Sequence, residues 1–231
     1  MINNQHKFTR VEKLIGEENL LLLKEKTILI VGIGGVGGAC LESLVRTGVG
    51  HVIIIDKDIV DVTNINRQVI ALTTTIGQKK VDVFKDRIKE INPDCKVEAL
   101  EMFLTKDNID LIDNYEIDYL IDACDTIETK KAIMKKCLDK KIPFITSLGT
   151  GNKFDPSLLE ITDIRKTKND PIARILRKYI KDNKINKKIT VLASSELPKK
   201  QNDRVVSSMA FVPNSAGLLI ASYIIRKFIC K

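Results

Sequence analysis

Apolar runs alternate with amphipathic stretches along residues 1–150. Runs at 27–31 and 51–56 and the stretch "DYLIDACD" end in glycines or acids. Runs of this length predict buried strands, and "KVEALEM" and "IPFITSLGTG" predict two more. We expect helices at 38–47, in "GQKKVDVFKDRIKEINPD" as far as Pro93, and at 127–140. This alternation predicts an α/β fold with a doubly wound, mainly parallel sheet.

The pattern changes after Gly151, where a polar connection contains one short strand at about 159–164. The helix that follows has Asp170 as its N-cap and Pro171 in its first position. Its basic face holds Arg174, Arg177, Lys178 and Lys181, and its apolar face holds Ile172, Ile175, Leu176, Tyr179 and Ile180. "ITVLASSE" predicts a late strand, "LPKKQNDRVVSSM" a mobile connection, and 213–229 a final helix.

Composition narrows the class of protein. Hydrophobic residues make up 44% of the 231 residues and aromatics only 5%, so the core must be aliphatic. The net charge of +8 favours an anionic partner such as nucleic acid or a nucleotide, although a generally lysine-rich surface gives the same excess. We expect no membrane span, because "AGLLIASYII" is too short to cross a bilayer, and no signal peptide, because the N-terminal stretch lacks an apolar run.

The five cysteines are scattered at 40, 95, 124, 137 and 230, without a CxxC pair. Such a set is typical of reduced thiols in a cytoplasmic protein. Only two histidines supplement them, so we expect no structural zinc. Cys40 follows the glycine loop but is expected to pack against the sheet, and Cys124 is expected inside a buried strand. None is placed as a transfer thiol should be.

The glycines Gly32, Gly34 and Gly37 form a GxGxxG motif between a predicted strand and a predicted helix. Glycines let the backbone turn tightly beside a phosphate, and the helix N-terminus favours negative charge. Asp56 ends the next strand, where an acid can accept hydrogen bonds from a ribose. These features predict a Rossmann-like nucleotide site, and they fit NAD as well as ATP.

The residues that follow favour ATP. Polar side chains crowd into one connection and the start of the next helix: Asp58, Asn64, Arg67, Gln68 and Lys80. Each alone could be a solvated loop residue, but together they suit a triphosphate whose α-phosphate is attacked. Asp125 follows a buried strand at the carboxyl edge of the sheet, where a carboxylate can hold Mg²⁺ between phosphate oxygens.

Four stretches in order, "GIGGVGG", "DKDIVDVTNINRQ", Lys80 and "DACDT", resemble the adenylation domain shared by ubiquitin-activating enzymes and bacterial sulfur-carrier adenylyltransferases. "FTRVEKLIGEENL" and "SLGTGNKFDPSLLEITDIRKTKNDPIARILRKYIK" resemble the branch that acts on threonylcarbamoyladenosine in tRNA. The resemblance implies one adenylation domain over 1–231, with a nucleotide-binding core at 1–150 and a substrate-facing extension at 151–231.

The resemblance also implies roles for single residues. Gly34 and Gly35 approach the phosphates, Asp56 holds the ribose, and Asp125 binds Mg²⁺. The triphosphate is bound or neutralised by Asn64, Arg67, Gln68 and Lys80. Arg10 reaches ATP from the partner subunit of a homodimer, which makes Arg10, Arg67, Lys80 and Asp125 the implied catalytic set. Gly38 stands where many relatives have serine, which implies that one phosphate contact is looser.

The implied reaction is an ATP-dependent cyclisation of the modified nucleoside through a carboxyl-adenylate. The basic helix face at Arg174, Arg177, Lys178 and Lys181 is the candidate tRNA surface. Three alternatives stay open: an adenylyltransferase for a ubiquitin-like sulfur carrier, an enzyme that adenylates another carboxylate, and a nucleotide-sensing module without turnover. Whether a sulfur-transfer protein docks is also open.

Overall fold

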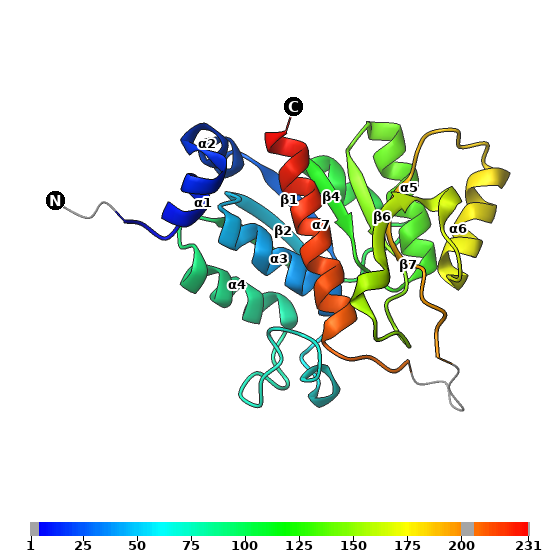
Figure 1. The fold of residues 1–231 in the computed structure, drawn as a ribbon, viewed down its shortest axis with the longest axis horizontal. Helices are drawn as coiled ribbons and strands as arrows, with labels where there is room; N and C mark the ends of the chain where they lie inside the picture. Colours follow the sequence, from blue (N-terminus) through cyan, green and yellow to red (C-terminus); the bar gives the residue numbers. More distant parts are fainter. Residues whose placement is uncertain (1–4, 200–205, 231) are drawn as a thin grey trace.

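The computed structural model describes residues 5–199 and 206–230, and its centre is one twisted sheet (Figure 1). Seven strands form this sheet in the order β3-β2-β1-β4-β5-β7-β6. They are β1 (Thr27–Val31), β2 (His51–Asp56), β3 (Lys96–Glu101), β4 (Tyr119–Asp122), β5 (Phe144–Ser147), β6 (Leu159–Asp163) and β7 (Thr190–Ser194). All neighbours pair in parallel except β6 and β7, which are antiparallel. The predicted fold class is confirmed.

Helices cover both faces of the sheet. They are α1 (Thr9–Ile15), α2 (Glu17–Lys24), α3 (Gly35–Thr47), α4 (Lys80–Ile91), α5 (Ile127–Lys140), α6 (Pro171–Asp182) and α7 (Phe211–Ile229). Alternate residues of a strand point to opposite faces. In β1, Ile28 and Ile30 therefore pack with α3, α4 and α7, whereas Leu29 and Val31 pack with α5.

A third apolar cluster joins α5 to α6 and buries Met134, Ala173, Leu176 and Ile180. Because this cluster contains Met134 of α5 as well as residues of α6, it attaches the extension to the nucleotide-binding half. Within the described part of the chain, no helix is both long and apolar enough to cross a membrane.

Most predicted elements are confirmed, with shifts at three boundaries. α3 begins at Gly35 rather than at 38, and α7 begins at Phe211 rather than at 213. β4 ends at Asp122, so the placement of Cys124 inside a strand was wrong. The expected mobile connection, 197–209, includes 200–205, which lie outside the described residues, and its described flanks at Lys199 and Ser207 are hydrogen-bonded to Asn152.

Candidate active site

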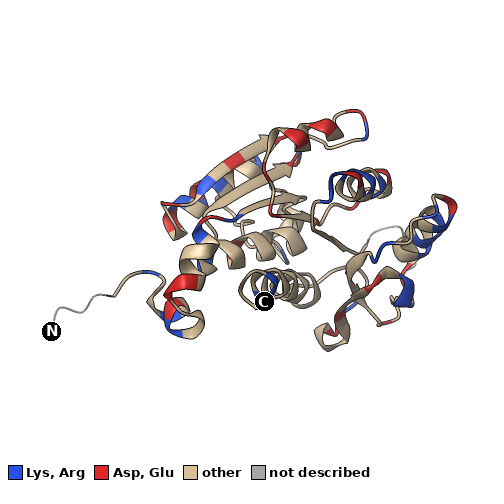
Figure 2. Cartoon of the chain, turned by 90° about the horizontal axis from the view of Figure 1, so that it is seen from above, with Lys and Arg blue, Asp and Glu red and all other residues tan. Residues whose placement is uncertain are grey.

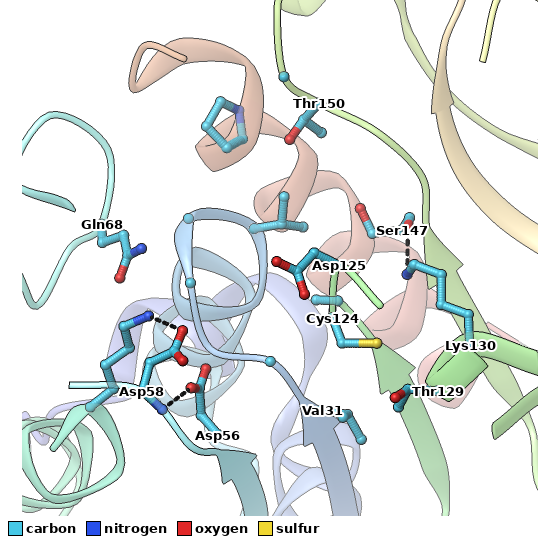
Figure 3. Close-up of a pocket in the computed structure, with 18 of the residues that line it drawn as sticks. Val31, Asp56, Asp58, Gln68, Cys124, Asp125, Thr129, Lys130, Ser147 and Thr150 are labelled. Carbon is cyan, nitrogen blue, oxygen red and sulfur yellow. Dashed lines mark hydrogen bonds and ion pairs between the residues drawn. The ribbon is translucent and has the colours of Figure 1, made fainter. Parts of the chain in front are cut away.

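A pocket of about 560 Å³ lies where β1, β2, β4 and β5 end (Figure 3). The carboxyl ends of parallel strands meet at one edge of a sheet, which is where open α/β sheets bind ligands. The lining comes from the glycine loop, the connection after β2, the start of α4, the loop after β4 and the segment 147–151. The structure brings the implied nucleotide residues together here, apart from Arg10 and the close-packed Gly37.

The glycine loop leaves the first turn of α3 open to the pocket. Gly32 has a φ of 84°, and a Cβ there would meet the Ala123 carbonyl oxygen at 2.8 Å. Glycine is therefore required both for the turn and for the close approach to the β4 loop. The N-cap of α3, Gly34, offers no side-chain cap, and the first turn contains no acid. The N–H groups of this turn are thus free to bind an anion.

Gly38 does not line the pocket. It is buried, and a Cβ there would meet Phe84 Cζ at 2.8 Å. This position packs against α4, which gives no support to the expectation of a looser phosphate contact.

Asp56 joins two segments of the site. Its carboxylate accepts hydrogen bonds from the backbone N–H groups of Ile33 and Asp58, both at 2.8 Å. The expected contact of Asp56 with a ribose stays a prediction. The observed bonds fix the glycine loop relative to the end of β2.

Lys80 is the first residue of α4 and is buried. Its Nζ donates to Asp58 Oδ2 at 2.9 Å, and the Asp58 side chain is about half exposed at 52%. One partly solvated carboxylate thus holds the ammonium at the pocket wall.

The turn after β2 supplies an amide and a guanidinium that are held by their own loop. Asn64 is buried, and its Oδ1 accepts from Asp61 N at 3.2 Å as part of a capping box. Arg67 Nη1 donates to Thr63 O at 2.8 Å and to Asn66 Oδ1 at 2.9 Å. The guanidinium of Arg67 must leave these acceptors, or share them, to meet a phosphate.

Gln68 has an unsatisfied polar group at the pocket wall. Its side chain is buried, and its Oε1 has no partner within the described ranges. A buried amide oxygen without a partner costs free energy unless a ligand or water satisfies it. Gln68 therefore has capacity for a ligand.

Asp125 follows β4 and is exposed at the pocket, where its carboxylate faces the cavity (Figure 3). Its one recorded hydrogen-bond partner is Thr126 Oγ1, at 3.3 Å. The described residues contain no group of three or more potential metal ligands. Mg²⁺ is usually held by only one or two carboxylates together with phosphates and water. The free Asp125 carboxylate fits that role.

The opposite wall, 147–151, presents backbone and small side chains. Gly149 N donates to Asp170 Oδ2 at 3.1 Å, and Lys153 Nζ donates to Gly149 O at 3.0 Å. Burial lowers the pKa of Lys153. The charged groups of Asp170 and Lys153 lie behind the wall and bind the backbone of Gly149. Asp170 also caps α6 through Ala173 N, as predicted.

Arg10 lies far from the pocket of its own chain. It is exposed on α1. α1 and α2 pack at the far end of α3, where Phe8 and Leu20 lie around Gly48. α3 has 13 residues and is about 20 Å long, and its other end opens the pocket.

The basic face of α6 is only partly free. Arg174, Lys178 and Lys181 are exposed, and Lys and Arg cluster along this end of the molecule (Figure 2). Arg177 instead turns inward, and its Nη1 donates to Ile164 O at 3.3 Å and to Thr167 O at 3.1 Å. The prediction was thus wrong for Arg177. Ile175 lies at the flank of the apolar stripe and is 38% exposed.

The cysteines that line or flank the site are not activated. Burial raises the pKa of the thiols of Cys40, Cys124 and Cys137. Cys124 lines the pocket, and its Sγ donates to Asp122 Oδ1 at 3.0 Å. A thiol with a raised pKa is a poor nucleophile at neutral pH. Cys230 is exposed at the end of α7.

Sequence reasoning missed the buried residues Lys130, Asp122 and Ser147. Lys130 and Ser147 line the pocket directly. A signal was present, because Lys130 occupies the helical stripe of Ile133, Met134 and Cys137. A lysine on the apolar stripe of a helix must find a buried partner.

The fold and the site define a nucleotide-dependent adenylating protein. Residues 8–229 match the ThiF family model, and the chain belongs to the ThiF family.

Relatives within that family narrow the comparison. The chain is 44% identical to the tRNA threonylcarbamoyladenosine dehydratase of Bacillus subtilis, over 95% of this chain and 93% of the relative. It is 34% identical to the solved structure of E. coli TcdA in complex with ATP, with a TM-score of 0.90, covering 96% of this chain and 93% of that one. A sulfur carrier protein adenylyltransferase of Thermus thermophilus is 36% identical over only 50% of this chain and 42% of the relative.

Proposed function

We propose that this chain uses ATP to dehydrate threonylcarbamoyladenosine in tRNA through a carboxyl-adenylate. The observation that carries the proposal is the composition of one pocket. It combines an open helix N-terminus, the cation of Lys80 and the free carboxylate of Asp125, without an activated thiol among the described residues. Dehydratases of this name match over nearly the full length of the chain, which supports the substrate.

The first step forms an adenylate. A carboxylate oxygen of the threonyl group attacks the α-phosphorus of ATP, and the bond to the pyrophosphate oxygen breaks. The N–H groups at the start of α3 and the Lys80 ammonium bind the phosphate charge, which is the stabilisation that this transition state needs. Bound Mg²⁺, held by Asp125, would neutralise the phosphate oxygens.

The second step closes a ring. A nucleophilic atom of the same modification attacks the acyl carbon, loses a proton, and expels AMP to give a five-membered ring. The tRNA loses one water in total, and ATP becomes AMP and pyrophosphate. Because ring closure is intramolecular, positioning alone can contribute up to about 7–11 kcal/mol. The segment 147–151 forms a wall of the pocket that can position the modified nucleoside. Because positioning promotes ring closure, the proposed reaction does not need a thioester.

Our proposal includes a homodimer in which Arg10 completes the partner's site. Arg10 lies beyond the far end of α3 from its own pocket. Exposed apolar side chains on α7, Phe211, Leu218 and Leu219, form a stripe suited to a subunit interface. Mixing Arg10→Ala chains with Asp125→Ala chains should restore activity in the heterodimer. An inactive mixture, or a fully active monomer in sedimentation, would contradict the proposal.

The exposed side of α6, with Arg174, Lys178 and Lys181, is the proposed tRNA contact. Ile172 on the same helix lines the pocket, so this surface leads away from the site of chemistry. We infer a cytoplasmic location, which agrees with a tRNA substrate. A sulfur-transfer partner has no support in the described residues, and the proposed reaction does not need one.

Mass spectrometry of tRNA from a deletion strain tests the function in the cell. The uncyclised modification should accumulate, and wild-type protein but not Asp125→Ala should remove it. Unchanged cyclised tRNA in the deletion strain would contradict the proposal. In that case, an adenylate formed on a ubiquitin-like carrier protein would favour the sulfur-carrier alternative.

A further inference from the structure

A buried ion pair beside the pocket has no role in the proposed reaction. Lys130 Nζ donates to Asp122 Oδ1 at 3.0 Å, and the two side chains are 1% and 0% exposed. The same Nζ donates to the Ser147 carbonyl oxygen at 2.8 Å. A pair this deeply buried is weak evidence for stability, because apolar residues of similar volume often serve as well. Its position at the pocket therefore calls for another explanation.

Asp122 controls the backbone that leads to Asp125. Asp122 Oδ1 accepts from Cys124 N at 3.3 Å and from Cys124 Sγ at 3.0 Å. These bonds set the turn immediately before Asp125. Among the described residues, only Thr126 donates a hydrogen bond to the Asp125 carboxylate, so the direction of Asp125 depends on this turn.

Ser147 begins the opposite wall. Ser147 is the first residue of the segment 147–151, which faces Asp125 across the cavity (Figure 3). The ammonium of Lys130 is therefore bonded both to the residue that shapes the Asp125 loop and to the base of the facing wall. It fixes these two walls relative to each other.

We propose that Lys130 is a positioning residue that holds the Asp125 carboxylate where it meets metal-bound ATP. This inference rests on the proposed function, because it takes Asp125 as the metal ligand. Displacement of a reacting or binding group by about 1 Å can cost about 10²-fold. The ion pair thus acts through Asp125 rather than by contact with the substrate.

Lys136 offers a matched control on the same helix. Its Nζ donates to Asp110 Oδ1 at 2.7 Å and to Asp113 Oδ2 at 2.6 Å, and its side chain is 9% exposed. Lys136 is not among the residues that line the pocket. A purely structural role for buried lysines of α5 would make Lys130 and Lys136 behave alike.

The test measures Mn²⁺ binding by electron paramagnetic resonance in the presence of a non-hydrolysable ATP analogue. The double variant Asp122→Asn/Lys130→Met removes both charges and leaves no lone buried ion. It should bind Mn²⁺ at least about 10-fold more weakly, a difference of about 1.4 kcal/mol. Binding of the analogue without metal should change less than about 2-fold, and Lys136→Met should leave Mn²⁺ binding unchanged.

A milder variant keeps the inference testable if the double variant does not fold. Cys124→Ala cuts one tie to Asp122 and should weaken Mn²⁺ binding by about 3-fold. Lys130→Arg keeps donors for both acceptors and should recover Mn²⁺ affinity to within about 3-fold of wild type. Wild-type Mn²⁺ affinity in the folded double variant, or in Cys124→Ala where the double variant is unfolded, would overturn the inference. Asp125→Asn separates the two proposals, because unchanged Mn²⁺ binding there would refute the metal assignment itself.

Discussion

The two sides of the pocket differ in where their charges lie. On the phosphate side, Asp58, Lys80 and Arg67 line the cavity. On the acceptor side, Asp170 and Lys153 lie behind the wall and bind the backbone of Gly149. In the proposed reaction, the charged side would bind ATP, and the side with its charges behind the wall would shape the substrate for ring closure. This difference agrees with a substrate that carries its own nucleophile.

Removal of Asp125 should have the largest effect on the charged side. Asp125→Ala is expected to lower the rate of AMP formation by at least about 10³-fold, since it removes the metal carboxylate. Its thermal midpoint should stay near that of wild type, because the side chain is exposed and fills little core volume. A rapid-quench assay of AMP release measures the rate, and Asp139→Ala on α5 is the control. Full activity of Asp125→Ala would remove the metal from the mechanism.

Lys80 should come next. Lys80→Met is expected to slow adenylation by about 10²–10³-fold, the usual cost of losing one donor to developing charge. Lys79→Met is a matched control, because Lys79 is adjacent but exposed and paired with Glu101 outside the pocket lining. Steady-state pyrophosphate release compares the two variants. Equal activities of the two variants would show that the position of Lys80 at the pocket wall does not contribute to adenylation.

Substitutions on the exposed side of α6 test whether this surface binds tRNA phosphates. Replacing Arg174, Lys178 and Lys181 with alanine should flatten the slope of log K against log salt by about 0.7–0.9 for each lost phosphate contact. Arg177→Ala should leave the slope unchanged and lower the thermal midpoint instead, because Arg177 holds the backbone of Ile164 and Thr167. Filter binding over a salt series measures the slope. A triple variant with the wild-type slope would place the tRNA elsewhere.

The smallest effect is expected from the thiols. A chain with all five cysteines replaced by serine or alanine should still cyclise the modification, provided that circular dichroism shows it folded. The raised pKa of Cys124 leaves it mostly protonated at neutral pH, and the reaction proposed here uses no thioester. Loss of cyclisation with ATP binding intact would restore a thioester step.

Much of the fold could be predicted because its elements have local signatures. Apolar runs followed by glycines or acids located the strands, and Asp170 with Pro171 located the start of α6. The start of α3 was placed too late, because Gly35, Gly37 and Gly38 are poor helix formers whose place in the helix depends on close packing.

The position of Gly32, Lys80 and Asp125 at one pocket was predictable from motif and spacing, and their chemical roles stay predictions. The site was not predictable where tertiary contacts decide. Arg177 has a helical position like that of Lys178, and only the neighbouring segment 164–167 turns it inward. Lys130 was missed because its partners, Asp122 and Ser147, come from strands that only the fold places beside it.

The stoichiometry of the purified reaction is the sharpest test of the proposed function. Purified protein is incubated with ATP, Mg²⁺ and tRNA that carries threonylcarbamoyladenosine, and the nucleosides, AMP and pyrophosphate are quantified by mass spectrometry. We expect one AMP and one pyrophosphate for each nucleoside that loses water, in wild type and in the cysteine-free chain alike. ATP turnover without loss of water from the nucleoside, or loss of water without AMP, would contradict the proposed function.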